Sequence, residues 1–183
     1  MALMHTPQKD ETFNAAPFAL KNIDGRTLSF DDIKGEKGTV LAFICNHCPY
    51  VQAIIERMVE DFKTLQDLGI GCAAIMPNDT NNYPEDSFEN MKKFAEKHGF
   101  SFPYLIDDSQ ETARAYDAIC TPDIFGFDAQ DRLQYRGRLD SAGPNAADTS
   151  TTKELVNAMK EIAQSGYSSA PQFSSMGCSI KWK

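Results

Sequence analysis

The sequence predicts an α/β protein in which helices flank a central mixed sheet. Between residues 39 and 116, apolar runs of strand length alternate with longer segments whose apolar residues recur every three or four positions. Two further pairs of short apolar runs surround turn-forming residues, at 22–25 and at 128–131, and indicate hairpins. Alternating strands and helices favour a parallel sheet, and the hairpins make that sheet mixed.

The first third of the chain contains an N-terminal β-hairpin, one central strand and a long helix. Runs 18–20 and 27–30 flank Asp24-Gly25, whereas residues 1–16 are polar and predict a loosely held arm. Run 39–44 is β-branched and apolar without alternation, which is typical of a strand buried on both faces. A helical pattern follows over 49–68, and Pro49 suits its first turn because proline lacks the N–H that would be unpaired there.

The remaining elements continue the alternation. We expect a buried strand over 70–76, an inserted helix over 84–98, a strand over 103–106 and a short helix capped by Asp108 or Ser109. A second hairpin is expected from runs 124–127 and 133–136, then a last helix capped by Thr151 or Thr152. Residues 1–183 are therefore predicted to form a single domain, with a core over about 13–165 and an irregular tail over 166–183.

Composition excludes several classes of function. The chain has 183 residues, a net charge of −8 and an isoelectric point near 4.8. Such a surface disfavours nucleic acid and anionic membranes as partners. No apolar segment is long enough to span a bilayer. The first residues lack the basic and apolar regions of a secretory signal, so with Met1 as the start a cytoplasmic protein is expected.

The chemistry of the chain is predicted to lie in Cys45-Asn46-His47-Cys48, between the apolar strand and the long helix. A C-x-x-C pair in that position is typical of redox chemistry, because the helix start supplies free N–H groups and positive dipole charge that favour a thiolate. Cys45 and Cys48 are the predicted catalytic thiols. His47 lies between them and would tune their pKa values.

The residues leave other interpretations open. Cys45, His47 and Cys48 are candidate ligands of a metal such as copper, although a structural zinc site needs four ligands and no second such pair exists. Cys120 and Cys178 are either additional redox thiols or bystanders, the first as a small buried residue and the second in a mobile tail. Cys72, in the middle of a strand, is expected to be a core residue.

Taken together, these features resemble the thioredoxin-like superfamily. Within it, the chain resembles the peroxiredoxin-like (AhpC/TSA-type) proteins with a thioredoxin-style C-x-x-C. The resemblance covers about residues 13–165. It rests on the N-terminal hairpin, the strand–C-x-x-C–helix unit, the inserted helix, residues 104–107 with the following helix, and Thr121-Pro122 before a strand. It implies that Pro122 is a cis-proline facing the C-x-x-C. Thr121 would offer its backbone to a substrate chain by strand-like pairing.

The resemblance also implies a choice between two attacking thiols. By the thioredoxin pattern Cys45 attacks and Cys48 resolves, and this is the default; by the peroxiredoxin pattern Cys48-Pro49 is the peroxidatic pair, which reverses the roles. The chain departs from the second pattern, because Cys45 stands where a Thr or Ser is expected and the activating Arg is missing from its usual place. Arg136 and Arg138 lie further on and receive no role.

We therefore expect a thiol–disulfide oxidoreductase whose redox group is its own disulfide, with no separate cofactor and no resident metal. Its partners would be a disulfide-containing protein or a thiol substrate, and an upstream reductant. The alternatives are a thiol-dependent peroxidase with an antioxidant role, and a metal-binding protein without turnover.

Overall fold

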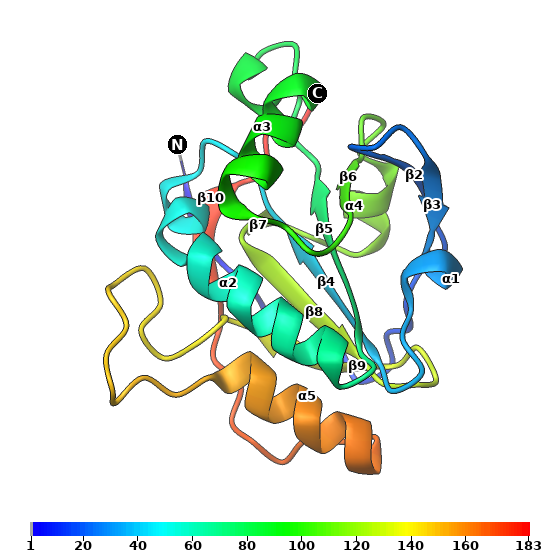
Figure 1. The fold of residues 1–183 in the computed structure, drawn as a ribbon, viewed down its shortest axis with the longest axis vertical. Coiled ribbons are helices and arrows are strands. Elements are labelled where there is room, and N and C mark those ends of the chain that lie inside the picture. Colours follow the sequence, from blue (N-terminus) through cyan, green and yellow to red (C-terminus); the bar gives the residue numbers. More distant parts are fainter. Residues whose placement is uncertain (1) are drawn as a thin grey trace.

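A computed structural model describes residues 2–183 (Figure 1). Its main sheet has seven strands in the order β3-β2-β6-β5-β4-β8-β9. Strand β4 pairs parallel with β5 and β5 parallel with β6, whereas the other neighbours are antiparallel. The predicted mixed sheet is confirmed, and its strands are β2 (Ala19–Asn22), β3 (Thr27–Ser29), β4 (Thr39–Phe43), β5 (Gly71–Met76), β6 (Tyr104–Ile106), β8 (Asp123–Phe127) and β9 (Leu133–Gly137).

Helices cover both faces of this sheet, as predicted. Successive residues of β4 point to opposite faces, so Val40 and Ala42 join one core cluster while Leu41 and Phe43 join the other. All four side chains are buried, which explains why the run shows no alternation in polarity. The first cluster is covered by α2 (Pro49–Asp67), α3 (Phe88–His98) and α5 (Glu154–Ser165), and the second by α1 (Phe30–Ile33) and α4 (Glu111–Ala115).

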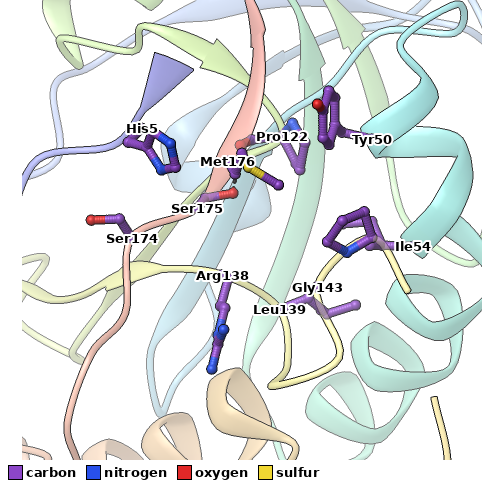
Figure 2. A pocket seen from close by; sticks show the side chains of 11 residues that line it. His5, Tyr50, Ile54, Pro122, Arg138, Leu139, Gly143, Ser174, Ser175 and Met176 are labelled. Carbon is purple, nitrogen blue, oxygen red and sulfur yellow. Dashed lines mark hydrogen bonds between the residues drawn. The ribbon is translucent and has the colours of Figure 1, made fainter. Parts of the chain in front are cut away.

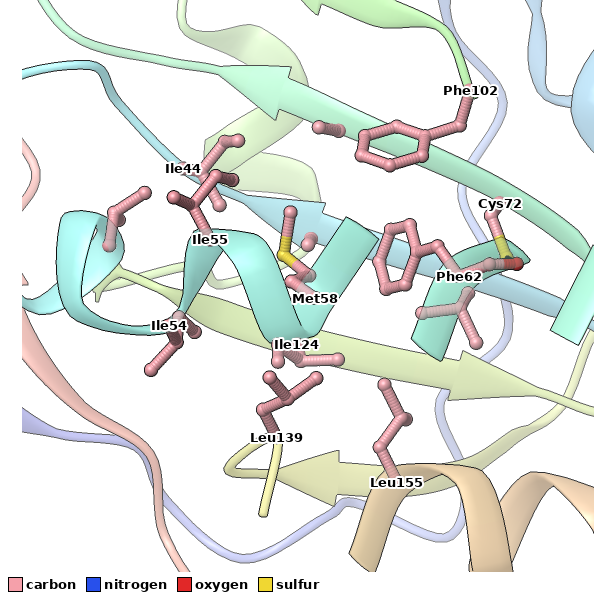
Figure 3. Packing of buried hydrophobic residues seen from close by; sticks show 14 of the residues in the cluster. Ile44, Ile54, Ile55, Met58, Phe62, Cys72, Phe102, Ile124, Leu139 and Leu155 are labelled. Atoms are coloured by element: carbon pink, nitrogen blue, oxygen red, sulfur yellow. Dashed lines mark hydrogen bonds between the residues drawn. The ribbon is translucent and has the colours of Figure 1, made fainter. Parts of the chain in front are cut away.

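The apolar face of α2 is the centre of the first cluster. Figure 3 shows Ile55, Met58 and Phe62 pointing from the helix toward the sheet. Cys72 lies there too, and its sulfur donates to the carbonyl oxygen of Phe62 at 3.8 Å. Burial raises the pKa of this thiol, so Cys72 is a core residue, as predicted.

Three predicted helix starts are wrong in detail. Ser87 is non-helical and divides the inserted segment into the 3₁₀ turn η1 (Pro84–Asp86) and α3. Neither Asp108 nor Ser109 is the N-cap of α4; that residue is Gln110, while the Asp107 carboxylate accepts from the N–H groups at the start of the helix. Lys153, rather than Thr151 or Thr152, precedes α5. These local choices depend on long-range packing that a sequence window does not contain.

Two segments near the chain ends form strands that the sequence did not predict; residue 1 lies outside the described residues. Strands β1 (Leu3–His5) and β10 (Met176–Ser179) form a second sheet with β7 (Cys120–Thr121), in the order β1-β10-β7. The predictions of a loose N-terminal arm and an irregular C-terminal tail are therefore wrong for β1 and β10. Each strand is too short to show a period, and its pairing partners lie far away in the sequence.

Candidate functional site

The C-x-x-C pair lies at the junction of β4 and α2. Cys45 follows the strand, Cys48 is the N-cap residue of the helix and Pro49 is its first residue, as predicted. Both thiols are buried, with 1% and 0% exposure. The N-cap position places the Cys48 sulfur beside the unpaired N–H groups of the first helical turn.

Thr121 and Pro122 contact this pair, as the resemblance implies, and the peptide bond between them is cis. The Cys48 thiol donates to the carbonyl oxygen of Thr121 at 3.0 Å, and the Thr121 hydroxyl lies 3.4 Å from the Cys45 sulfur. Pro122 also lines a cavity of about 190 Å³ together with Tyr50, Ile54 and Met176 (Figure 2). A small molecule held in this cavity would therefore lie next to the turn that contacts both thiols.

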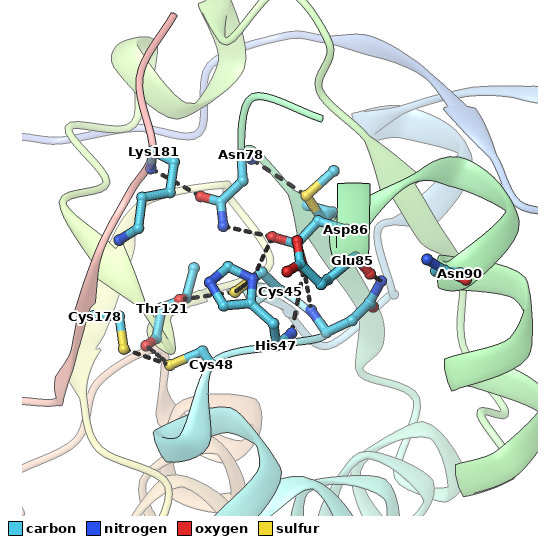
Figure 4. A network of polar contacts seen from close by, with 12 residues as sticks. Cys45, His47, Cys48, Asn78, Glu85, Asp86, Asn90, Thr121, Cys178 and Lys181 are labelled. Atoms are coloured by element: carbon cyan, nitrogen blue, oxygen red, sulfur yellow. Dashed lines mark hydrogen bonds and ion pairs between the residues drawn. The ribbon is translucent and has the colours of Figure 1, made fainter. Parts of the chain in front are cut away.

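His47 is held by a carboxylate that the sequence did not single out. Its Nδ1 lies 2.7 Å from Oδ2 of Asp86, whose side chain is fully buried. Asp86 also accepts from the backbone N–H groups of Asn46 and His47 and from the side chain of Asn78 (Figure 4). Asp86 is 39 residues from His47, and its acidic neighbours suggested only a helix start. No sequence signal connected the two.

Hydrogen bonding controls the charge of this pair. The bond to Asp86 raises the pKa of His47. Burial acts to raise the pKa of Asp86, but the bonds from His47 and Asn78 outweigh it, so that pKa is lowered. The ion pair therefore forms beside Cys45, whose sulfur is 3.9 Å from His47 Nδ1.

The two thiols of the motif differ in acidity. The hydrogen bond from Cys45 lowers the pKa of Cys48 to about 5; burial opposes this shift, and the Cys178 thiol and the Val51 N–H support it. The same bond to Cys48, then burial and the charge of Asp86, raise the pKa of Cys45. Cys48 is therefore the more acidic thiol of the pair, and the default order of attack expected from the sequence stays a prediction.

Of the two further candidate thiols, the structure brings Cys178 into the site. Its sulfur is 3.1 Å from the sulfur of Cys48, and its backbone lies opposite Thr121 in the β10–β7 pairing. Cys178 is 3% exposed, so the expectation of a mobile tail thiol is wrong. The Cys120 sulfur instead donates to the carbonyl oxygen of Pro122, and burial raises its pKa.

The structure replaces one of the metal ligands expected from the sequence: Asp86 takes the place of Cys48. Within residues 2–183, the ligand atoms of Cys45, His47 and Asp86 lie within 4.8 Å of one another. Cys48 is not part of that group, because its sulfur faces Thr121 and Cys178.

Comparisons with known proteins agree with this architecture. The chain is similar to thiol-disulfide oxidoreductase ResA of Geobacillus thermodenitrificans, with 28% identity over 120 residues, which are 66% of this chain. That match spans 64% of the relative, so the chain covers less than two thirds of its length. An uncharacterized conserved protein from Geobacillus kaustophilus has 42% identity and a TM-score of 0.93, covering 100% of this chain and 97% of that one.

The fold is thioredoxin-like. The thioredoxin domain of a thiol-disulfide oxidoreductase from Bacteroides vulgatus superposes with a TM-score of 0.63 at 16% identity, over 85% of this chain and 99% of that one. The AhpC/TSA family model matches residues 13–136. It includes the C-x-x-C, Asp86 and the Thr121–Pro122 turn, and the chain belongs to the AhpC/TSA family.

Proposed function

We propose that the protein is a thiol–disulfide oxidoreductase in which Cys48 attacks a disulfide of a protein or a small thiol compound. The main support is the position of Cys48, which is the N-cap residue of α2 and whose sulfur lies 3.1 Å from the sulfur of Cys178. A helix start favours the thiolate that attacks a disulfide, and a second thiol nearby completes the exchange. The similarity to ResA supports the same chemistry.

The reaction proceeds in two exchanges. The Cys48 thiolate bonds to one sulfur of the substrate disulfide, and the other sulfur leaves as a thiolate. A second thiol of the protein then bonds to Cys48 and expels the first substrate sulfur, so the substrate is reduced by two electrons and the protein holds a disulfide. An upstream reductant restores the dithiol.

Cys45 is the resolving thiol of the sequence motif, and the His47–Asp86 pair assists it. The charge of Asp86 contributes to the raised pKa of Cys45. A protonated His47, 3.9 Å from the Cys45 sulfur and paired with Asp86, neutralises that charge. A charged His47 therefore offsets the repulsion that the Asp86 carboxylate alone would exert on a Cys45 thiolate.

A thiol-dependent peroxidase is less well supported. Arg136 is paired with the buried Asp123 and Arg138 with Glu154, so both guanidinium groups are engaged by carboxylates. The Cys48 thiol donates to the Thr121 carbonyl oxygen, and its sulfur lies 3.1 Å from the Cys178 sulfur. Neither arginine is therefore placed to supply the activating cation that the peroxiredoxin pattern expects.

Dithiothreitol-driven reduction of insulin tests the proposal. We expect the wild type to accelerate the reaction and Cys48→Ser to abolish the acceleration, because the serine hydroxyl does not form the mixed disulfide. Cys72→Ser is the matched control, since its sulfur lies in the core between Phe62 and Ile70. Equal rates for wild type and Cys48→Ser would contradict the proposal.

A second candidate function is metal binding without turnover by Cys45, His47 and Asp86, carried by the proximity of their ligand atoms. A thiolate and an imidazole suit copper or zinc. Metal analysis of reduced protein after incubation with copper(I) or zinc tests this. Stoichiometric metal that is lost in Asp86→Asn would support it, and metal bound equally well by that variant would remove it.

A further inference from the structure

We propose that Cys178 is a third redox thiol, which β10 presents to Cys48 as an internal substrate strand and which forms a disulfide with Cys48 during turnover. This inference rests on the proposed function, since it supplies a second resolving thiol for the same site. Figure 4 shows the Cys178 sulfur pointing toward Cys48 from the C-terminal segment. The two sulfurs are 3.1 Å apart, so closing a disulfide requires an approach of about 1 Å.

Strand β10 takes the position expected of a substrate. By the resemblance, Thr121 would offer its backbone to a bound substrate chain. In the structure that edge is paired with β10, and Cys178 is the residue directly opposite Thr121. The carbonyl oxygen of Thr121 also accepts from the Cys48 thiol. A strand in this register therefore aims its cysteine at the attacking sulfur.

The close approach of β10 depends on Gly177. A Cβ built at Gly177 would collide with the carbonyl oxygen of Thr121. Glycine is therefore required where the strand passes nearest to the active-site turn. Cys178 follows directly, so the same close approach positions its sulfur.

Hydrogen bonds hold the strand on both sides of Cys178. Before it, Ser175 donates from its backbone N–H to the Thr6 hydroxyl and from its own hydroxyl to the carbonyl oxygen of Pro122. After it, the backbone N–H of Lys181 donates to Asn78, whose amide group donates to Asp86. The strand is thereby fastened to the cis-proline turn and to the network around His47.

The exchange balances without a further reactant. In the mixed disulfide, Cys48 is bonded to a substrate sulfur. The Cys178 sulfur bonds to Cys48, the bond between Cys48 and the substrate breaks, and the Cys178 proton passes to the departing substrate thiolate. The substrate disulfide is the oxidant. Burial, then the bond to Cys48, raises the pKa of Cys178 to about 12, so at rest Cys178 stays protonated and does not compete as the attacking thiol.

Oxidation of Cys45→Ser protein with diamide tests the bond directly. This variant lacks the motif partner of Cys48, so peptide mapping by mass spectrometry should find Cys48 linked to Cys178 within one molecule. Cys45→Ser/Cys120→Ser is the matched control and should form the same link, because the Cys120 sulfur faces the Pro122 carbonyl. Reaction with an aromatic disulfide reagent gives the second readout: Cys45→Ser should release both thiols of the reagent, and Cys45→Ser/Cys178→Ser only one.

The outcomes separate this inference from the proposed function. Free Cys178 after oxidation of Cys45→Ser, with a reagent adduct retained on Cys48, would overturn the inference and leave the exchange at Cys48 intact. A Cys48–Cys178 link in a protein that does not accelerate insulin reduction would contradict the proposed function instead. Release of both thiols by Cys45→Ser/Cys178→Ser would also overturn the inference, because another group would then resolve Cys48.

Discussion

At the scale of single residues, the site depends on which sulfur carries the charge. Cys48 lies at a helix start beside the Cys178 thiol, whereas Cys45 lies beside the Asp86 carboxylate. The C-x-x-C and His47 were predictable from a short motif with its own chemistry, whereas the place of Thr121 and Pro122 followed from the resemblance to a known family. Asp86 and Asn78 were not, since only folding brings them to His47.

The acidity of Cys48 is the first residue-scale prediction. Thiolate absorbance in the ultraviolet, measured against pH and corrected with Cys48→Ser, should rise with a midpoint of about 5. In Cys45→Ser the midpoint should move up toward the ordinary value of 9.0, because the largest lowering influence is the bond from Cys45. A midpoint that stays the same in Cys45→Ser would contradict this explanation.

The His47–Asp86 pair gives a pH-dependent prediction. Because the pKa of His47 is raised in the fold, its contribution to stability is full below 6.5 and is lost as pH rises through the raised value. Because the pKa of Asp86 is lowered in the fold, its contribution to folding stability is present above pH 3.8 and is lost as the pH falls through the lowered value. Asp86→Asn should therefore show its largest deficit in unfolding free energy between these values.

Urea denaturation of wild type and Asp86→Asn at about pH 5.5 and about pH 9 checks this, and the deficit should shrink at the higher pH. In NMR titration the His47 pKa should fall toward 6.5 in the variant. An unchanged His47 pKa would contradict the assigned pairing.

At the scale of elements, the predictable parts are those whose signal lies within one segment of the chain. The apolar face of α2, the uniformly apolar strand β4 and the two hairpins can each be predicted from residues within the segment itself. Strands β1, β7 and β10 have two to four residues each and form only because they meet one another. The C-terminal segment therefore looked irregular, although it covers the active-site turn.

Gly177→Ala tests the contribution of β10. The added methyl group collides with the Thr121 carbonyl, so β10 must shift away from β7. We expect a loss of about 1–3 kcal/mol in unfolding free energy. The Cys48–Cys178 link should also form more slowly on oxidation. Ser179→Ala on the same strand is the control, and equal stability of the two variants would show that the close approach is unimportant.

At the scale of the whole molecule, the two sheets have different roles at the site. The seven-stranded sheet and its helices hold the C-x-x-C in place, and the small sheet of both chain ends covers it. None of the described helices has the length and apolar composition required to cross a membrane. All three sulfurs are buried and β10 lies beside Cys48, so we expect access to Cys48 to depend on this strand.

Removing residues 176–183 should expose the thiols without removing a strand of the main sheet. We expect retained far-ultraviolet circular dichroism, lower stability because Ile180 leaves the second core cluster, and faster alkylation of Cys48 by N-ethylmaleimide. Removing only residues 182–183, beyond β10, should leave alkylation near the wild-type rate. Unchanged alkylation in the longer truncation would contradict the covering role of this strand.

The site of the mixed disulfide tests the central claim most directly. Cys45→Ser/Cys178→Ser leaves Cys48 without either proposed resolving thiol, so a disulfide-containing peptide should remain bonded to it. Mass spectrometry should locate that adduct on Cys48, whereas Cys48→Ser/Cys178→Ser should form little adduct on Cys45 under the same conditions. An adduct that forms readily on Cys45 and not on Cys48 would contradict the assignment of Cys48 as the attacking thiol.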